Sequence, residues 1–547
     1  MSRPPTPGPG ATLAPPPVIL DGATLTPKKV ALIARYGSVA EIAPQAHARN
    51  DRARGAIAAL LARGDNLYGV TTGVGALRAY RVPESQRERH SLGLLRSHAC
   101  GAGQPLPAQL VRAAMATRAN QLGAGGAGVT RELLDTLVGT LNAGLSPFTR
   151  ELGSLGTGDL TNLADIALAL LGEGRVWRGD DLVDAGPALA DAGLTPARLG
   201  PRDGLAFMSS NAVSIGRAAL LVVDARRLLD AWLSVAALSF EAAAADPVVL
   251  DPRIHSWRHR PGQAAVAARM RELLEGVNRR TRDPGPLGIQ DPYPFRAQPQ
   301  VDGTAHDALR VLEETVVHEL NFAGENALIV PGENALTVPG ENTLTGAGQD
   351  PMTGAGEDPV TGAGADAPAA LANGNPHAAP LANAIDGLRT ALAQSAALIA
   401  ARVSTLLDSS LTGLPPFLAR RPGPESGALV LEYTAHAAVA EVRSLVTPVA
   451  AQTVSVSRGV ESHSSLAPIA ARRAQETLSA LRVAVATELV VAVRALRVAG
   501  HEPIGAGIQP LWQAARERLD PDLRDRPLHP DIEAARQLIE GWEAELG

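Results

Sequence analysis

The sequence predicts a mostly α-helical protein built around a bundle of long helices. Between Val213 and Ala245 there is no proline, and apolar residues recur at three- and four-residue intervals, as on the buried face of a helix. Similar stretches cover Leu381–Leu411, Leu429–Leu445 and Ala467–Val498. Several of them span about 30 residues, or roughly 45 Å at the helical rise. Apolar helices of this length need partners along their whole length, so we expect a bundle that other subunits complete.

Composition places the chain among cytoplasmic globular proteins. It has 547 residues, a formal net charge of −6 and a single cysteine, Cys100. The mild charge gives no basis for binding nucleic acid or an anionic membrane surface, and one cysteine excludes an internal disulfide framework. We find no run of about 18 uncharged apolar residues, which a membrane span requires. The Pro/Gly-rich residues 1–17 lack the apolar core of a signal peptide and are expected to form a disordered tail.

One segment breaks the helical pattern. From Gly324 the chain reads GENALIVP, GENALTVP, GENTLTGA, GQDPMTGA and GEDPVTGA, with glycine every eight residues, and this composition cannot sustain a helix. Short Gly/Asp repeats can bind calcium, but the period is not nine and the first units lack acidic pairs. We therefore expect a solvated loop inserted at about 324–366, and no metal. The predicted organisation is an N-terminal domain over 18–200, the helical bundle over 201–500 and C-terminal helices over 501–547.

Four separated segments carry residue types that are typical of catalysis. They are LYGVTTGVGALR from Leu67, LLRSHACGAGQPLP from Leu94, GSLGTGDL from Gly153 and QDPYPFRAQPQVDG from Gln290. Their order and spacing in a helical chain resemble the aromatic amino acid lyase family, which contains histidine, phenylalanine and tyrosine ammonia-lyases and related aminomutases. The resemblance continues through HELNFAGENALIV, NGNPHAAPLANAIDGL, GLPPFL and SVSRGVESHSSLAPIAARR, and covers roughly residues 18 to 500. It implies a homotetramer in which residues from three subunits converge on each active site.

The family's cofactor is a methylidene-imidazolone ring, formed when an internal Ala-Ser-Gly cyclises and loses two waters. Such an electron sink assists because the β-proton of an amino acid is barely acidic and ammonia leaves poorly. Here the matching place reads Gly156-Thr157-Gly158, and the stretch before it is one residue shorter than in the family pattern. Dehydrated threonine would carry a methyl on the carbon under attack, and the shortened turn departs from the strained geometry that cyclisation needs. We expect no cofactor unless this tripeptide cyclises.

A second departure from the family pattern also argues against the ring. Where the family has Leu-Asn-Gly-Thr-Gln beside the ring, the chain reads Met208-Ser209-Ser210-Asn211-Ala212. Ser209 falls on the position of the asparagine that polarises the ring carbonyl in the family, and Asn211 lies two places along. Loss of this asparagine together with the ring-forming serine indicates a relaxed need for the ring.

The resemblance assigns the remaining machinery to tyrosine and arginine side chains. Tyr68 matches the family's catalytic base, although a tyrosine with a pKa of about 10 is a poor base at neutral pH unless its phenolate is stabilised. Tyr293 matches the second catalytic tyrosine. Arg296 matches the arginine that binds the substrate carboxylate, which a guanidinium fork can hold through two hydrogen bonds. The structural alternatives are a packing tyrosine at position 68 and an ordinary ion pair at position 296.

Four further residues are candidates for contacting the substrate. His98 resembles the selectivity position of histidine-type members, and Glu461 matches a glutamate of the same type and is a further catalytic candidate. Together they could hydrogen bond a polar ring, whereas a phenyl-binding pocket would favour apolar groups; a mutually satisfied buried pair is the alternative. Asn321 and Asn326 match polar positions around the substrate. These residues indicate a polar, carboxylate-bearing, amino-acid-like substrate.

Three hypotheses for function remain open at this point. The first is a lyase without the ring, in which Tyr68 drives elimination of a group easier to expel than ammonia, or the reverse addition or a cyclisation. The second is a conventional histidine-type ammonia-lyase or aminomutase whose ring derives from Thr157. The third is a non-catalytic homologue that binds a small acid.

Overall fold

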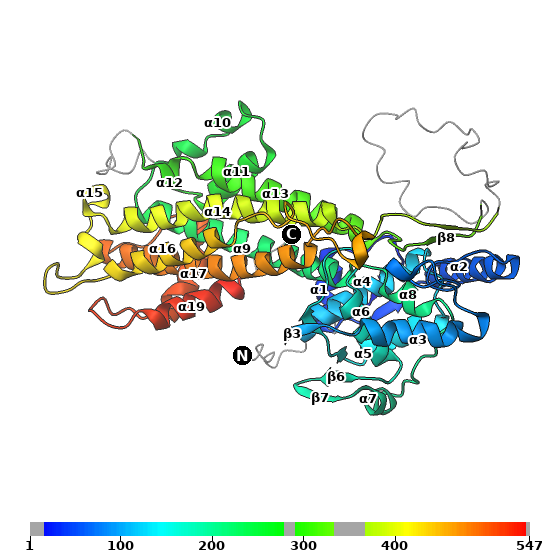
Figure 1. Ribbon diagram of the computed structural model, residues 1–547. Coiled ribbons are helices and arrows are strands. Elements are labelled where there is room, and N and C mark those ends of the chain that lie inside the picture. The colour runs from blue at the N-terminus through cyan, green and yellow to red at the C-terminus, as the bar shows by residue number, and fades with distance from the viewer. Residues whose placement is uncertain (1–15, 278–289, 333–366, 543–547) are drawn as a thin grey trace. The chain divides into compact units, whose positions relative to one another are not determined.

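The computed structural model describes residues 16–277, 290–332 and 367–542 (Figure 1). The expected tail over residues 1–17, apart from its last two prolines, and the repeats beyond Gly332 lie outside these described residues. The chain divides into two compact units; the first consists of Met1–Leu220, Thr315–Ala382 and Ala450–Pro468, and the second of Leu221–Glu314, Asn383–Val449 and Ile469–Gly547. Because the chain returns twice to each unit, this division is discontinuous and differs from the predicted boundaries at 200 and 500.

The part of the chain before residue 212 forms short helices and strands. The helices are α1 (Pro27–Tyr36), α2 (Pro44–Arg63), α3 (Arg87–His98), α4 (Ala108–Ala124), α5 (Arg131–Asn142), α6 (Leu160–Leu170), α7 (Ala185–Asp191) and α8 (Asp203–Met208). The strands are β1 (Val18–Leu20), β2 (Ala40–Ile42), β3 (Ala102–Pro105), β4 (Leu145–Pro147), β5 (Arg150–Leu152), β6 (Arg175–Arg178) and β7 (Asp181–Asp184).

Small sheets connect these helices. β1 and β2 form a parallel pair, β4, β6 and β7 form an antiparallel sheet, and β3 pairs with β5. In the β3–β5 pair Ala102 lies opposite Leu152. Since β3 follows α3 and β5 precedes the segment GSLGTGDL, this pairing brings the end of α3 close to that segment.

The later part of the chain forms the long helices. They and the shorter elements between them are α9 (Ala212–Ala242), α10 (Pro252–Ser256), α11 (Pro261–Leu273), α12 (Tyr293–Arg296), α13 (Gln298–Leu320), β8 (Leu328–Val330), β9 (Ala369–Leu371), α14 (Ala379–Leu407), α15 (Ser409–Thr412), α16 (Leu429–Ser444), α17 (Ala467–Ala499), α18 (Gln509–Arg518) and α19 (His529–Glu540). The four long helices predicted from apolar periodicity are confirmed as α9, α14, α16 and α17, and the fold is mostly helical as expected.

Buried polar contacts tie the long helices of the second unit together. Arg402 of α14 donates to both carboxylate oxygens of Glu488 of α17, over 2.6 and 2.9 Å, and both side chains are fully buried. Ser239 of α9 donates to the same carboxylate over 2.7 Å. These helices run alongside one another in Figure 1. A buried charge pair of this kind requires that both partners be present.

Two described segments are long and apolar enough to cross a membrane by length and composition, which the sequence analysis did not anticipate. They are Asp203–Ala242 and Ala379–Leu407. Their most apolar windows are 94% and 67% buried inside the protein. Packing against other helices therefore accounts for their composition.

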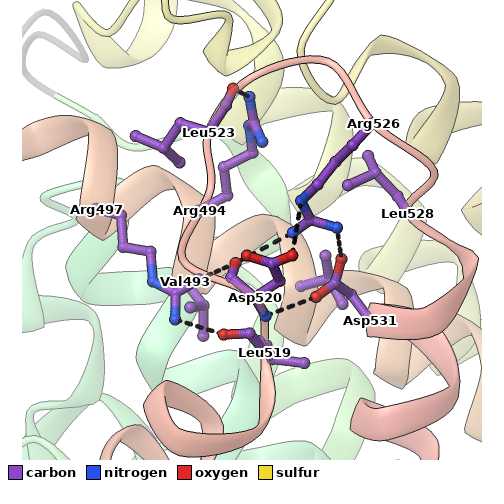
Figure 2. A pocket seen from close by; sticks show the side chains of 10 residues that line it. Val493, Arg494, Arg497, Leu519, Asp520, Leu523, Arg526, Leu528 and Asp531 are labelled. Atoms are coloured by element: carbon purple, nitrogen blue, oxygen red, sulfur yellow. Dashed lines mark hydrogen bonds and ion pairs between the residues drawn. The ribbon is translucent and has the colours of Figure 1, made fainter.

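The loop between α18 and α19 is bound to α17 by arginine side chains. Arg494 donates to the Leu523 carbonyl over 2.6 Å, and Arg497 donates to the Asp520 carbonyl over 2.8 Å (Figure 2). The cavity that these side chains line has a volume of about 20 Å³, which is room for about one water molecule.

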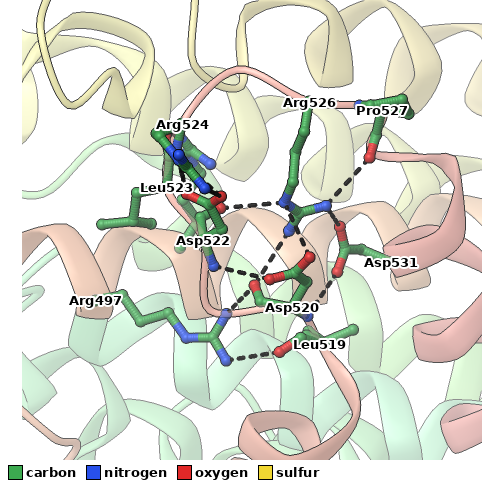
Figure 3. Close-up of polar contacts among 10 residues, drawn as sticks. Arg497, Leu519, Asp520, Asp522, Leu523, Arg524, Arg526, Pro527 and Asp531 are labelled. Carbon is green, nitrogen blue, oxygen red and sulfur yellow. Dashed lines mark hydrogen bonds and ion pairs between the residues drawn. The ribbon is translucent and has the colours of Figure 1, made fainter.

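The same loop is braced from within by Arg526. Its guanidinium donates to Asp531 over 2.6 Å and to the Asp522 carbonyl over 3.1 Å, while the Asp520 N–H donates to Asp531 over 3.0 Å (Figure 3). Burial on its own would lower the pKa of Arg526, but the bond to Asp531 and the surrounding aspartates raise it. The arginines bind carbonyl and carboxylate oxygens of the loop and of α19, so we assign this cluster a structural role: it holds the loop against α17.

Candidate active site

Tyr68 lies on a loop that follows α2 and folds back on itself. Thr72 and Arg81 form an antiparallel bridge that closes the loop. Inside it, the Gly75 N–H donates to the Tyr68 hydroxyl oxygen over 2.7 Å. Gly75 has a φ of 55°, a left-handed conformation that favours glycine, and a Cβ at this position would lie 2.7 Å from the Ser457 Oγ, so the serine side chain would have to move. The N–H is thus aimed at the oxygen that would carry the charge of a phenolate.

The Gly156 carbonyl is held by two other parts of the chain. It accepts from the Ser465 Oγ over 2.9 Å and from the Ala378 N–H over 3.1 Å. One residue earlier, the Leu155 carbonyl accepts from the Leu466 N–H over 2.8 Å. Gly156 has a φ of 89°, and a Cβ there would overlap the Ser465 Oγ. The alanine of the family tripeptide would therefore displace this serine.

Asn211 holds the other end of the tripeptide. Its Oδ1 accepts from the Gly158 N–H over 3.0 Å, and its Nδ2 donates to the Pro376 carbonyl over 2.5 Å. Ser209, which the family resemblance places at the asparagine position, closes the end of α8 by donating its N–H to the Leu205 carbonyl. Asn211, two residues further along, therefore contacts the tripeptide, but it accepts from the Gly158 N–H and does not donate to a carbonyl of the tripeptide.

Asp159 anchors the same segment to the start of α9. Its N–H donates to the Ser210 carbonyl over 2.7 Å, and its carboxylate accepts from the Ser214 N–H and Oγ over 2.7 and 3.0 Å. The residue is 1% exposed. Burial raises the pKa of Asp159 to about 6, against the hydrogen bonds from Ser214 and the charge of Arg217, which lower it.

The Thr157 hydroxyl donates to the Glu461 Oε2 over 3.0 Å. Glu461 ends a tight loop in which its backbone pairs with that of Val456. Three successive residues of the loop, Ser457–Gly459, have φ values of 54°, 58° and 83°, a left-handed run that is uncommon for side chains larger than glycine. The strained loop presents its carboxylate to the position where the family forms its ring.

Ser457 joins the glutamate loop to the tyrosine loop. Its Oγ accepts from the Ala76 N–H over 3.1 Å, one residue after the glycine that contacts Tyr68. Through this bond and the one between Thr157 and Glu461, the structure brings three predicted site residues into one connected group.

One ring nitrogen of His98 forms a hydrogen bond within its own helix. Its Nδ1 lies 2.7 Å from the Leu94 carbonyl, one turn back along α3. A carbonyl can only accept, so Nδ1 carries the proton and Nε2 is an acceptor in the neutral ring. Among the described residues no hydrogen bond joins His98 to Glu461, so the mutually satisfied pair that the sequence left open is not what the structure contains.

Two histidines that the sequence analysis did not single out lie next to this group. The His377 Nε2 is 2.9 Å from the His463 Nδ1, with ring centroids 5.0 Å apart. Burial, and then the neighbouring His463, lower the pKa of His377. Each lies within a segment that carried the resemblance, NGNPHAAPLANAIDGL and SVSRGVESHSSLAPIAARR, but nothing in the sequence indicates that they meet.

The two candidate asparagines have different surroundings. The Asn321 side chain accepts from the Leu25 N–H and donates to the Leu25 and Val317 carbonyls, each over 2.8 Å. These bonds give it a structural role, so we leave it out of the proposed substrate contacts. Asn326 is partly buried and accepts from the Asn373 N–H over 3.1 Å.

Tyr293 and Arg296 form α12 and belong to the second unit. Tyr293 is 66% exposed, and the Arg296 guanidinium carbon lies 4.8 Å from its ring centroid, a cation–π arrangement. The Arg296 Nε is buried and has no hydrogen-bond partner among the described residues. A buried donor without an acceptor is costly, so this nitrogen is suited to an acceptor that a ligand supplies.

The helical fold, the Tyr68 loop and the tripeptide that is held at both ends together have the arrangement of a lyase. The chain matches the family model described as aromatic amino acid lyase over residues 25–517, and it belongs to this family. It is therefore an ammonia-lyase family enzyme of the carbon–nitrogen lyase class, and family membership does not support the non-catalytic hypothesis.

Individual relatives span nearly the whole chain. The chain is 33% identical over 523 residues to a histidine ammonia-lyase of Symbiobacterium thermophilum, and the match covers 95% of this chain and 96% of that one. A solved structure of the ergothioneine-degrading enzyme ergothionase from Treponema denticola, in complex with desmethyl-ergothioneine sulfonic acid, is 26% identical with a TM-score of 0.85 and coverages of 96% and 98%. Histidine ammonia-lyase from Trypanosoma cruzi is 29% identical with a TM-score of 0.82 and coverages of 95% and 92%.

The tripeptide is a poor fit to the methylidene-imidazolone ring. A five-membered ring would have to join the nitrogen of Gly158 to the carbonyl carbon of Gly156. That nitrogen donates to Asn211, and the hydroxyl that dehydration would remove donates to Glu461. Ring formation would break both contacts and would leave a methyl group on the reactive carbon.

Proposed function

We propose that the protein eliminates a tertiary amine from an imidazole-bearing amino acid betaine and does so without a methylidene-imidazolone ring. The observation that carries this proposal is the Thr157 hydroxyl, which donates to Glu461 from a tripeptide held at both ends. Without an electrophile of its own, the enzyme needs a substrate whose nitrogen already departs readily. A quaternary ammonium meets this need because it leaves as a neutral amine.

The elimination needs only a base and a well-placed substrate. Tyr68, as the phenolate, removes a proton from the carbon next to the ring, and that C–H electron pair forms a carbon–carbon double bond. The bond from the α-carbon to nitrogen breaks, and its electrons leave with the amine. The products are an unsaturated acid and a neutral tertiary amine, with the proton on Tyr68. The Gly75 N–H supports this step by binding the tyrosine oxygen.

The substrate ring is assigned to Glu461 and His98. The Glu461 carboxylate accepts hydrogen bonds, and the His98 Nε2 is an acceptor because Nδ1 is bound to the Leu94 carbonyl. A ring with two N–H donors, such as an imidazolium or an imidazole-2-thione, offers one donor to each. This match favours a betaine whose ring is an imidazolium or an imidazole-2-thione over a phenyl or hydroxyphenyl substrate.

The carboxylate of the substrate is assigned to Arg296, with Tyr293 beside it and Asn326 as a further polar contact. The unpartnered Nε of Arg296 supports this role. As the family resemblance implies, we propose a cytoplasmic homotetramer in which other subunits supply part of each site. The similarity to an ergothioneine-degrading enzyme supports a substrate other than free histidine.

The proposal is tested by offering the purified enzyme two substrates that differ only at nitrogen, histidine and its Nα-trimethyl betaine. We expect trimethylamine and an unsaturated imidazole acid from the betaine, and no ammonia from histidine. Tyr68→Phe is the matched control and should release neither. Ammonia from histidine, with the betaine untouched, would refute the proposal.

One observation favours a second candidate, a histidine ammonia-lyase with a threonine-derived ring. The Gly156 carbonyl accepts two hydrogen bonds, from Ser465 and Ala378, and such donors would make its carbon a better electrophile for cyclisation. This candidate requires that the segment lose two waters, which a mass measurement detects directly.

A further inference from the structure

We infer that Thr157 has become a positioning residue, whose hydroxyl orients the Glu461 carboxylate toward the imidazole ring of the substrate. The inference rests on the proposed function, since only an uncyclised threonine keeps its hydroxyl. It gives the ring-forming position a new role in substrate selectivity. Glu461 would contact the substrate directly, and Thr157 would act through it.

The placement of the hydroxyl depends on a rigid backbone around it. On one side the Gly156 carbonyl is bound by Ser465 and Ala378, and on the other the Gly158 N–H is bound by Asn211. Threonine is branched at Cβ, which restricts χ1. Both features reduce the number of positions that the hydroxyl can take.

The glutamate has few other constraints on its carboxylate. Among the described residues, the hydrogen bond from Thr157 to Oε2 is the one side-chain hydrogen bond of the Glu461 carboxylate. Its loop is held through backbone pairing with Val456 and through Ser457, which accepts from Ala76. The loop therefore fixes the backbone position of Glu461, and the hydrogen bond from Thr157 fixes the direction of its carboxylate. With Oε2 engaged, Oε1 remains for an N–H of the ligand.

The contact also explains why a ring-free enzyme would keep a hydroxyl here. A glycine or alanine at position 157 would satisfy the backbone bonds of the segment equally well, because none of them uses the side chain. Only the bond to Glu461 depends on the hydroxyl. Serine could make the same bond, with greater rotational freedom.

The experiment compares two saturated acids that cannot react, 3-(imidazol-4-yl)propionate and 3-phenylpropionate, by calorimetry on the full-length protein. Thr157→Val keeps the branched shape and removes the hydroxyl. We expect it to weaken binding of the imidazole acid by about tenfold, the usual effect of losing one hydrogen bond to a charged group, and to leave the phenyl acid within about twofold. Thr157→Ser should restore the wild-type preference. The matched control is Thr477→Val, a buried threonine of α17 whose hydroxyl donates to the Arg473 carbonyl, and it should change neither affinity.

A double-mutant cycle separates positioning from general damage. In a Glu461→Gln background, Thr157→Val should have little further effect on the imidazole acid, because the two residues act as one unit. Equal losses for both acids, or additive losses in the cycle, would overturn the inference. Thr157→Ala, with its melting temperature measured, provides a second variant if valine perturbs folding.

Failure of the inference is distinguishable from failure of the proposed function. If the peptide containing Thr157 is two waters lighter than its sequence, both fall together. If its mass is unmodified and the betaine is turned over, but Thr157→Val keeps the wild-type preference, the function stands and only the positioning role is refuted.

Discussion

Replacing Asp159 by asparagine would remove a buried carboxyl group whose pKa differs between the folded and the unfolded protein. Burial raises its folded-state pKa from 3.8 to about 6. A proton therefore binds the folded protein more tightly, so the contribution to stability is fully present below about pH 4 and is lost as the pH rises through about 6. The whole effect is of order 3 kcal/mol, from about two pKa units at 1.36 kcal/mol each. About 1.4 kcal/mol of it falls between pH 5 and pH 7.5.

The assay is urea unfolding of the wild type and of Asp159→Asn at several values between pH 5 and pH 7.5. Asparagine does not titrate, so its stability relative to the wild type should rise with pH by about 1.4 kcal/mol over this range. Asp251→Asn is a control without pH dependence in this range, because hydrogen bonds from Arg253 hold the pKa of Asp251 down to about 2 and its carboxylate is therefore ionised above about pH 5 in both the folded and the unfolded protein. A wild-type-minus-Asp159→Asn difference that is independent of pH would refute the account of this anchor.

Three further substitutions test other parts of the structure. Tyr68→Phe should lower turnover by at least about 10²-fold while the melting temperature stays close to wild type, because it removes the proposed base; a variant of undiminished activity would exclude that role. Glu488→Ala should destabilise the protein by about 3–5 kcal/mol in urea unfolding, because it leaves Arg402 buried and unpaired, and a loss below about 1 kcal/mol would contradict that packing. Asn211→Ala should cost about 2 kcal/mol, since the Gly158 N–H loses its acceptor, and an unchanged melting temperature would argue against the bridge.

The long helices were predictable because their signal is local. Apolar periodicity and the absence of proline placed one helix at residues 213–245, and the structure forms α9 at Ala212–Ala242. The same holds for α17, whose observed ends differ from the prediction by a single residue. The ends of these helices could be predicted without knowing which elements they pack against. The division into two units could not, because contacts between distant segments decide which parts of the chain belong to the same unit.

The site was predictable only as a set of residues. The family pattern brought Tyr68, Thr157 and Glu461 into one hypothesis, but the hydrogen bond between Thr157 and Glu461 joins positions 304 residues apart. The family pattern also places Ser209 at the asparagine position, and the sequence alone does not say that Asn211, two residues further along, binds the Gly158 N–H. Such offsets arise from backbone geometry, which residue identity alone does not encode.

The measurement that tests the central claim most directly is the mass of the peptide from Gly153 to Asp165, mapped from the intact purified protein. The account predicts the unmodified mass, with the Thr157 hydroxyl retained to bind Glu461. A peptide lighter by two waters would show that the threonine cyclises, and would contradict a ring-free lyase.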